Sequence, residues 1–550
     1  MSAKREAMRV TNVKKTILVA RLLLALTVAL LLTATAYAAA PGITGPTFNL
    51  TAQTAYLNQP DGGMVYSWGY GCNSAPSGFN PSATLMPGSN CPSMQVPGPT
   101  LIVTEGNTVV VTLTNNLPTA AGNTSILFPG FQVTTGGTGV PGLLTQEAAP
   151  GGTVTYTFTA STPGTHAYYS GTQGDLQIEM GLYGAIIVLP KTIPGNCTTG
   201  LAASNLAAER FWHESDFRLA AAAYDHPKTC YDREYLFQWA EMDPNIHRQA
   251  LAQVTALAGC TAGAPGCSLE VATEPYHPSY FLINGRSMPD LMDANFAPEY
   301  PHQPYNGNPH MHPGEQVLIR TIGQGRWQHP FHEHGNHVRI LGRDGNLILS
   351  QSDPNLLAGL LMFNTDTTPG QAFDGIFYWT GRGLNWDPYA HNPKSADLSA
   401  KLPCAPDANG YNTGFLSTDT TFSGTPSTSV VDAINYYEWC QDHNKPLQVA
   451  PFGDVAGGGP ATLPDANILT NGAWYGGSPY LGPNANVRAT GPTSALQPSN
   501  SQANPGNERG FAFMWHSHNE REITTNNVFP GGMLMMMLVD SREFVIDESN

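Results

Sequence analysis

Short segments in which apolar and polar residues alternate dominate the chain between residues 48 and 189. In residues 107–116 the apolar side chains Val109, Val111 and Leu113 alternate with threonines, and residues 152–159 repeat this pattern. An alternation with a period of two predicts strands with one buried and one polar face. Frequent glycine and proline residues between these segments predict tight turns. The pattern therefore predicts a β-sandwich in the first part of the chain.

The same succession of segments recurs later in the chain. Residues 313–320 resemble 105–111, residues 369–378 resemble 150–156, and residues 509–539 resemble 163–188. Such internal similarity indicates two structural units of one design. We therefore expect an all-β protein with two sandwich domains, at residues 45–195 and 205–550. The second domain has a long insertion at about 384–507, which is rich in Gly, Pro, Ser and Asn. A short helix is expected at residues 245–260.

The first 38 residues have the features of a secretory signal peptide. Six basic residues precede or adjoin the apolar run 22–32, and Ala36-Tyr37-Ala38 provides a small-residue cleavage site. We expect a secreted or periplasmic protein, with an uncleaved membrane anchor as the alternative. No later segment is long and apolar enough to span a bilayer, so no membrane span is expected in the mature chain.

Removal of this segment makes the chain more acidic. The whole chain has 25 basic and 41 acidic residues; without the six basic residues and Glu6 these become 19 and 40, a net charge of −21. This balance argues against nucleic acid as a partner and favours cationic partners, including metal ions. Solubility outside the cell is an equally good explanation of the charge.

Eight cysteines in an exported chain predict disulfide bonds. Pairing of near neighbours would join Cys72 to Cys91, Cys197 to Cys230, Cys260 to Cys267, and Cys404 to Cys440. Eight cysteines allow about a hundred connectivities, so the spacing alone leaves this pairing open.

Histidines are concentrated in two strand-like stretches. Residues 328–337 contain His329, His332, His334 and His337, and residues 511–518 contain His516 and His518. In a strand, residues two apart project from one face about 6–7 Å apart, so His332 and His334 face the same way and Glu333 faces the opposite way. An isolated His-x-His pair is more often a surface coincidence or a hydrogen-bonded pair. If the two strands are neighbours, however, four imidazoles meet and form a copper or zinc site.

These motifs, together with the paired units, resemble the multicopper oxidase family of cupredoxin-fold proteins. The resemblance is carried by His-Pro-Phe-His-x-His-Gly at 329–335, Trp-His-x-His at 515–518, the downstream Gly-Gly-Met533, and Gln177 followed by residues 181–188. It implies tandem cupredoxin-like Greek-key β-sandwich domains and copper as the cofactor. It further implies that His332, His334, His516 and His518 are ligands of a copper cluster, His329 a type 1 copper ligand and Met533 a residue near its axial position.

The chain also departs from the family pattern. The type 1 cysteine of the family falls on Ser517, and its second type 1 histidine falls on Glu522. A blue copper site needs a thiolate ligand, so none is expected. In the first domain, the family's His-x-His falls on Gly171 and Gln173.

The other first-domain copper ligands are missing as well. Residues 127–131 contain no histidine, and His166 is interpreted as a strand-end residue rather than a replacement ligand. A complete trinuclear copper cluster within one chain is therefore not expected. His310 and His312 are interpreted as a loop at the rim, with a secondary metal site as the alternative.

Two functional hypotheses follow. The first is a secreted copper oxidoreductase with a reduced four-histidine site that acts on a small reductant or a metal ion. The second is a non-catalytic, extracellular copper-binding or structural protein of cupredoxin-like fold. A second subunit that supplies the missing ligands is a further alternative, and the sequence does not specify the oligomeric state.

Overall fold

A computed structural model describes residues 40–198, 215–312, 315–335, 337–378, 415–416, 433–434, 510–540 and 546. All of these belong to the compact unit Tyr37–Asn550. The predicted signal peptide lies outside the described residues. Within the described ranges, no helix combines the length and the apolar character needed to cross a membrane.

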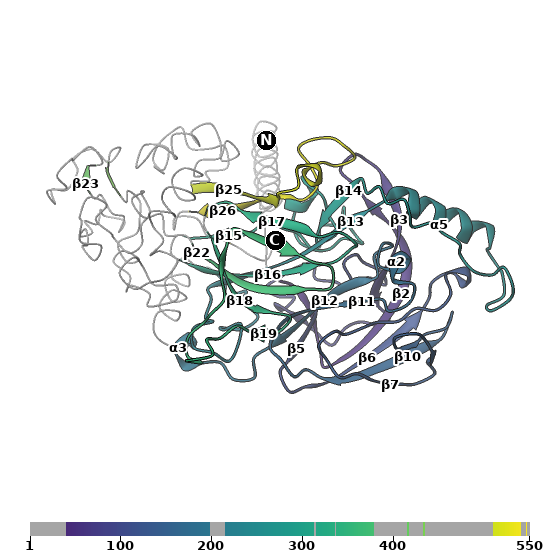
Figure 1. Ribbon diagram of the computed structural model, residues 1–550, viewed down its shortest axis with the longest axis horizontal. Helices are drawn as coiled ribbons and strands as arrows, with labels where there is room; N and C mark the ends of the chain where they lie inside the picture. Colours follow the sequence, from purple (N-terminus) through teal and green to yellow (C-terminus); the bar gives the residue numbers. More distant parts are fainter. Residues whose placement is uncertain are drawn as a thin grey trace, which may run out of the picture. The chain divides into compact units, whose positions relative to one another are not determined.

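The first sandwich consists of two five-stranded sheets (Figure 1). One sheet has the order β11 (Gly164–Tyr169), β12 (Tyr183–Leu189), β5 (Leu101–Thr104), β1 (Gly42–Thr44) and β4 (Phe79–Asn80). The other has the order β3 (Met64–Cys72), β2 (Thr47–Asn58), β6 (Thr108–Asn115), β10 (Thr153–Thr159) and β7 (Thr134–Gly136). Val109, Val111 and Leu113 of β6 are fully buried in the core between them, as their alternation predicts.

The second sandwich consists of a seven-stranded and a five-stranded sheet. The larger has the order β14 (Tyr280–Ile283), β13 (Arg233–Met242), β16 (Gln316–Gly323), β22 (Ala372–Tyr378), β18 (Val338–Arg343) and β19 (Asn346–Leu347), with β20 (Leu361–Met362) also paired to β18. The smaller has the order β15 (His310–Met311), β26 (Leu534–Asp540), β25 (Gly510–Ser517), β17 (His329–Glu333) and β21 (Asn364–Thr367). Their shared core contains Trp239, Phe331 and Trp515.

The strand pairing confirms the internal repeat. The order β3-β2-β6-β10 in the first sandwich corresponds to β14-β13-β16-β22 in the second, with antiparallel, parallel and antiparallel pairs in both. Likewise β11-β12-β5 corresponds to β25-β26-β15, an antiparallel pair followed by a parallel one. The expected all-β fold with tandem sandwiches is thus confirmed.

Apolar contacts and buried polar groups join the two sandwiches. Ile102 and Ile187 of the first pack with Leu236 and Ile322 of the second. Asp374 accepts hydrogen bonds from the amide and the hydroxyl of Thr165, at 3.0 and 2.6 Å.

The remaining described elements are short, apart from one helix. They are η1 (Thr119–Ala121), β8 (Val140–Pro141), β9 (Gln146–Glu147), α2 (Gly174–Gln177), α3 (Gly195–Thr198), η2 (Asp290–Met292) and η8 (Glu520–Ile523). Within the predicted insertion only β23 (Phe415–Leu416) and β24 (Ala433–Ile434) are described, as a two-stranded sheet.

The longest helix among the described residues, α5 (Pro244–Ala256), matches the predicted one. It begins where Asp243 accepts a hydrogen bond from the Asn245 amide, and Pro244 occupies the first helical position. Both features favour a helix start because they satisfy or remove an unpaired amide.

Three of the four disulfides suggested by spacing are present. They join Cys72 to Cys91, Cys197 to Cys230, and Cys260 to Cys267. Cys404 and Cys440 lie outside the described residues.

Candidate metal centre

The two histidine strands are direct neighbours in the five-stranded sheet. β17 pairs antiparallel with β25, which places His332 opposite His516, Phe331 opposite Ser517 and Glu333 opposite Trp515. Because residues opposite each other point to the same face of a sheet, this register brings the imidazoles of the two strands together. The two histidine strands are therefore adjacent, as the predicted metal site requires.

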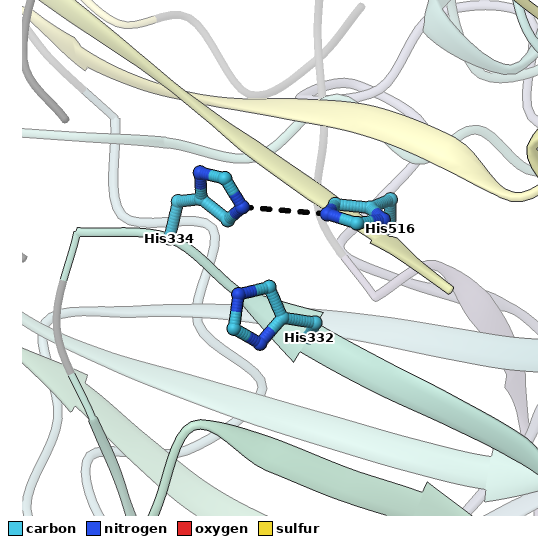
Figure 2. Close-up of side chains that lie close together, drawn as sticks. All are labelled: His332, His334 and His516. Atoms are coloured by element: carbon cyan, nitrogen blue, oxygen red, sulfur yellow. Dashed lines mark hydrogen bonds between the residues drawn. The ribbon is translucent and has the colours of Figure 1, made fainter. Parts of the chain in front are cut away.

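Three imidazoles converge on one point (Figure 2). His332, His334 and His516 each offer a nitrogen, and these three atoms lie within 4.8 Å of one another. The Nε2 atoms of His334 and His516 are 3.3 Å apart. The ring of His518 lies beside this group, with its centroid 4.7 Å from that of His332 and 5.6 Å from that of His516. His518 is exposed, whereas His516 is buried.

Backbone carbonyls fix the orientation of two of these rings. The Nδ1–H of His332 donates to the Phe363 carbonyl at 2.7 Å, and the Nδ1–H of His516 donates to the Ser517 carbonyl at 2.7 Å. A proton held on Nδ1 leaves Nε2 as the nitrogen with the free electron pair, which is the usual way in which a histidine ligand is prepared for a metal.

The imidazoles are held in the neutral form that a metal requires. Burial lowers the pKa of His332 and of His516. Burial and the neighbouring histidines lower the pKa of His334 to about 3. A convergent set of neutral imidazole nitrogens fits copper and also zinc. Because His332 and His334 are only half-buried, the site is accessible from solvent.

His329 is not part of this cluster. It is fully buried, with its Nδ1 2.8 Å from Glu522 and its Nε2 2.9 Å from Glu241. Burial alone would lower the pKa of His329, but the hydrogen bonds to Glu241 and Glu522 raise it to about 9. Both ring nitrogens therefore donate protons to carboxylates, and His329 is an imidazolium at neutral pH.

The surroundings of His329 do not fit a type 1 copper. The Ser517 hydroxyl, at the position of the family's cysteine, donates to Glu522 at 2.5 Å. Met533 is buried in the core, and its backbone pairs with Ser517 and Glu522. A protonated imidazole, a hydroxyl and a carboxylate do not provide the thiolate and neutral imidazoles of a blue site.

Glu333 faces away from the histidine cluster, as strand alternation predicts. Its carboxyl group is buried and accepts a hydrogen bond from Thr365 at 2.9 Å. Burial raises the pKa of Glu333 well above its usual value.

Three other histidines near these motifs, His337, His310 and His312, lie outside the three-histidine group. His337 lies beside Phe363, with ring centroids 5.3 Å apart. His310 pairs with Leu538, whereas His516 pairs with Leu534 at the opposite end of β26. His312 lies on the same short segment as His310, so neither belongs to the cluster.

The first sandwich has hydrogen bonds where the second has histidines. Ser170, the residue after β11, donates to Gln177 at 2.6 Å, and Thr172 donates to Glu147 at 2.8 Å. Leu127 bridges to Tyr169 of β11. His166 is buried, bonds the Thr162 carbonyl at 3.1 Å and packs on Phe131, so it occupies a structural position within β11.

The sequence interpretation missed Glu241. This residue lies in β13, far from both histidine motifs, and it is fully buried against His329. The only sequence signal was an acidic residue in an otherwise largely apolar strand, Tyr235–Met242.

Comparison with known proteins agrees with the motifs. The sequence model of the multicopper oxidase family matches residues 92–193. The chain is 36% identical over 124 residues to multicopper oxidase MCE of Talaromyces pinophilus, covering 21% of this chain and 20% of that protein. Over residues 92–193, the chain resembles the multicopper oxidase family. It is also 40% identical over 96 residues to an L-ascorbate oxidase of Brassica rapa subsp. pekinensis, covering 17% of this chain and 16% of that protein.

These matches are local. They span about a fifth or less of the length of the curated multicopper oxidases. Among solved structures, the multicopper oxidase mgLAC aligns over 90% of this chain and 86% of its own, with 15% identity and a TM-score of 0.43. A blue copper oxidase from Nitrosomonas europaea aligns over 89% and 85%, with 14% identity and a TM-score of 0.42. Copper is the cofactor of this family, and the histidine donors described above fit it.

Proposed function

We propose that this multicopper oxidase homologue is an exported copper oxidoreductase whose metal site is formed by His332, His334, His516 and His518. The observation that carries the proposal is the convergence of three neutral imidazole nitrogens within 4.8 Å, with His518 beside them. Histidine-rich sites favour copper among the common divalent ions. The predicted signal peptide supports a location outside the cytoplasm.

In this proposal the protein residues bind and orient the metal and leave one side open. Nε2 of His332 and His516 are directed by the hydrogen bonds of their Nδ1 atoms. The half-buried position of His332 and His334 leaves room for a small reductant or a metal ion to approach. Copper bound there would supply one-electron chemistry, which the side chains themselves cannot.

The replacement of two type 1 ligands by Ser517 and Glu522 favours a second candidate. With Ser517 and Glu522 in place of the cysteine and histidine, the family's usual electron-entry site is replaced by hydrogen-bonded protein groups. A non-catalytic copper-binding protein would need only the four histidines and no electron entry.

Metal analysis distinguishes these functions. The mature chain is loaded with copper, and its metal content, visible spectrum and paramagnetic resonance spectrum are recorded. We expect about one to two coppers per chain and no intense blue band, because Ser517 stands where the family's thiolate ligand would be. Oxygen consumption with a small organic reductant supports the oxidoreductase; stoichiometric copper without turnover supports the binding protein. Absence of bound copper contradicts both.

A further inference from the structure

His329 lies in the middle of a chain of hydrogen-bonded side chains. On one side, Glu522 lies 2.8 Å from Nδ1; on the other, Glu241 lies 2.9 Å from Nε2. All three side chains are fully buried or nearly so. Because each ring nitrogen faces a carboxylate oxygen, which has no proton to donate when ionised, each nitrogen carries a hydrogen. The centre of the chain therefore holds a proton that a neutral histidine would lack.

The chain continues through a tyrosine into the first sandwich. The Tyr276 hydroxyl oxygen lies 3.1 Å from Glu241 Oε1 and 2.6 Å from Glu179 Oε2. When one of the two carboxyl groups is protonated, it can donate its proton to the hydroxyl oxygen while the hydroxyl gives its own proton to the other carboxylate. Burial raises the pKa of Tyr276 well above its usual value, so this hydroxyl is protonated at neutral pH.

The two ends of this series of hydrogen-bonded side chains lie in different parts of the structure. At one end, Glu179 Oε1 lies 3.5 Å from Nε2 of His247, a close contact without a hydrogen bond, and His247 lines a cavity of about 230 Å³ beside α5. At the other end, Glu522 accepts a hydrogen bond from Ser517, the last residue of β25, which follows His516 and precedes His518. The series of side chains thus extends from a cavity to β25, the strand that carries His516.

Other polar and charged groups around the chain hold its members in place. The amides of Arg326 and Trp327 each donate to Glu241 Oε1 at 2.8 Å. The Arg326 guanidinium stacks on the Tyr276 ring at 4.1 Å, and the Asp243 amide donates to Glu179 at 2.6 Å. Thr367 accepts from the His329 amide at 3.2 Å, and the Tyr183 phenol faces Glu241 and Glu179.

We propose that Glu522, His329, Glu241, Tyr276 and Glu179 form a proton relay between the cavity at His247 and strand β25. The proposal rests on the proposed function. Copper held by His332, His334, His516 and His518 would supply one-electron chemistry at the open side of the site. A small reductant would give up one electron there and release any proton it loses to the solvent. The relay would carry one proton from the cavity side towards β25 for each electron gained, and return it when that electron is lost, so that the net charge near β25 stays constant.

The relay is tested first in the metal-free protein, so the result does not depend on copper binding. The protein is labelled with ¹⁵N-histidine, and the rate at which the ring N–H protons of His329 exchange with solvent is measured by nuclear magnetic resonance. Tyr276→Phe removes the shared hydroxyl and keeps the ring that packs against Trp327 and Arg326. We expect exchange to slow by about tenfold or more, since one hydrogen-bonded step is lost. Tyr280→Phe is the matched control. Tyr280 lines the same cavity, but its hydroxyl donates to Asp61, which is not part of the proposed relay.

A second variant guards against a folding defect. Glu179→Gln keeps the size of the side chain and interrupts the chain at the next position, so it is expected to slow the exchange as well. Equal exchange in wild type and Tyr276→Phe overturns the relay, as does equal slowing in Tyr276→Phe and Tyr280→Phe. In the copper-loaded protein, the relay further predicts that the copper potential depends on pH in wild type and less so in Tyr276→Phe. Failure to bind copper contradicts the proposed function and leaves the exchange result valid.

Discussion

The two sandwiches share one strand order and differ at the end of equivalent strands. In the second sandwich, β25 ends in His516 and Ser517, and burial lowers the pKa of the His516 imidazole. In the first, β11 is followed by Ser170 and Thr172, whose hydroxyl groups bond to Gln177 and Glu147. The ends of equivalent strands in the two sandwiches can therefore carry either histidines suited to bind a metal or polar side chains that hydrogen-bond to one another. The strand pairing alone does not determine which.

The largest expected effect is on copper binding at the end of β25. His516→Ala removes one of three convergent donors, so we expect copper affinity to fall by about 100-fold or more, because even mutations of the groups that support metal ligands cost about 10–100-fold. Titration with copper followed by elemental analysis measures the loss. The control is His277→Ala, which removes an exposed histidine outside the cluster. Equal affinity in His516→Ala and wild type would show that the copper binds elsewhere.

The buried ion group of Arg320, which also bonds Thr165 of the first sandwich, should be the most sensitive point for stability. Arg320 pairs with Glu234 at 2.9 Å and with Asp374 at 3.4 Å, and all three side chains are buried. Arg320→Met leaves two uncompensated carboxylates, so we expect a loss of about 3–5 kcal/mol in the free energy of unfolding.

Urea denaturation measures this loss. Glu274→Gln provides the control, because Glu274 is largely exposed in its pair with Arg326 and such pairs contribute about 0–1 kcal/mol. A similar small effect in both variants would mean that the buried ion group of Arg320 contributes little to the stability of the fold.

The imidazolium at His329 makes the second sandwich sensitive to alkaline pH. The pKa of His329 is raised from 6.5 to about 9 in the folded chain. A raised pKa stabilises the fold fully below pH 6.5, and this contribution is lost as the pH rises through about 9. The difference corresponds to about 3 kcal/mol. Unfolding free energies measured between pH 6 and 10 should fall in wild type and change less in His329→Gln; parallel curves would contradict this explanation.

The smallest effect is expected in the polar network of the first sandwich. Gln177→Leu leaves the hydroxyls of Ser170 and Thr124 without their acceptor, so we expect a loss of about 1–3 kcal/mol in stability. Copper affinity should stay unchanged, because this network lies in the other domain. A change in copper affinity would reveal that the two equivalent strand ends are coupled.

Local patterns in the sequence were sufficient to predict the strands and the repeat. The alternation of Val109, Val111 and Leu113 with threonine reflects burial on one face of β6, and this is encoded residue by residue. The meeting of His332 and His516 was predictable only conditionally, because it depends on which strands are neighbours. Glu241 could not be predicted: its role arises from a contact with His329, 88 positions away, and no local spacing encodes such a contact.

The histidine cluster also bears on the order of events in folding. β17 and β25 meet through three residue pairs only, and His332 and His516, which face each other there, are separated by most of the C-terminal half of the chain. During synthesis, the first pair of histidines is therefore complete long before the second emerges. Binding of copper at full affinity would then report that the last two strands have docked.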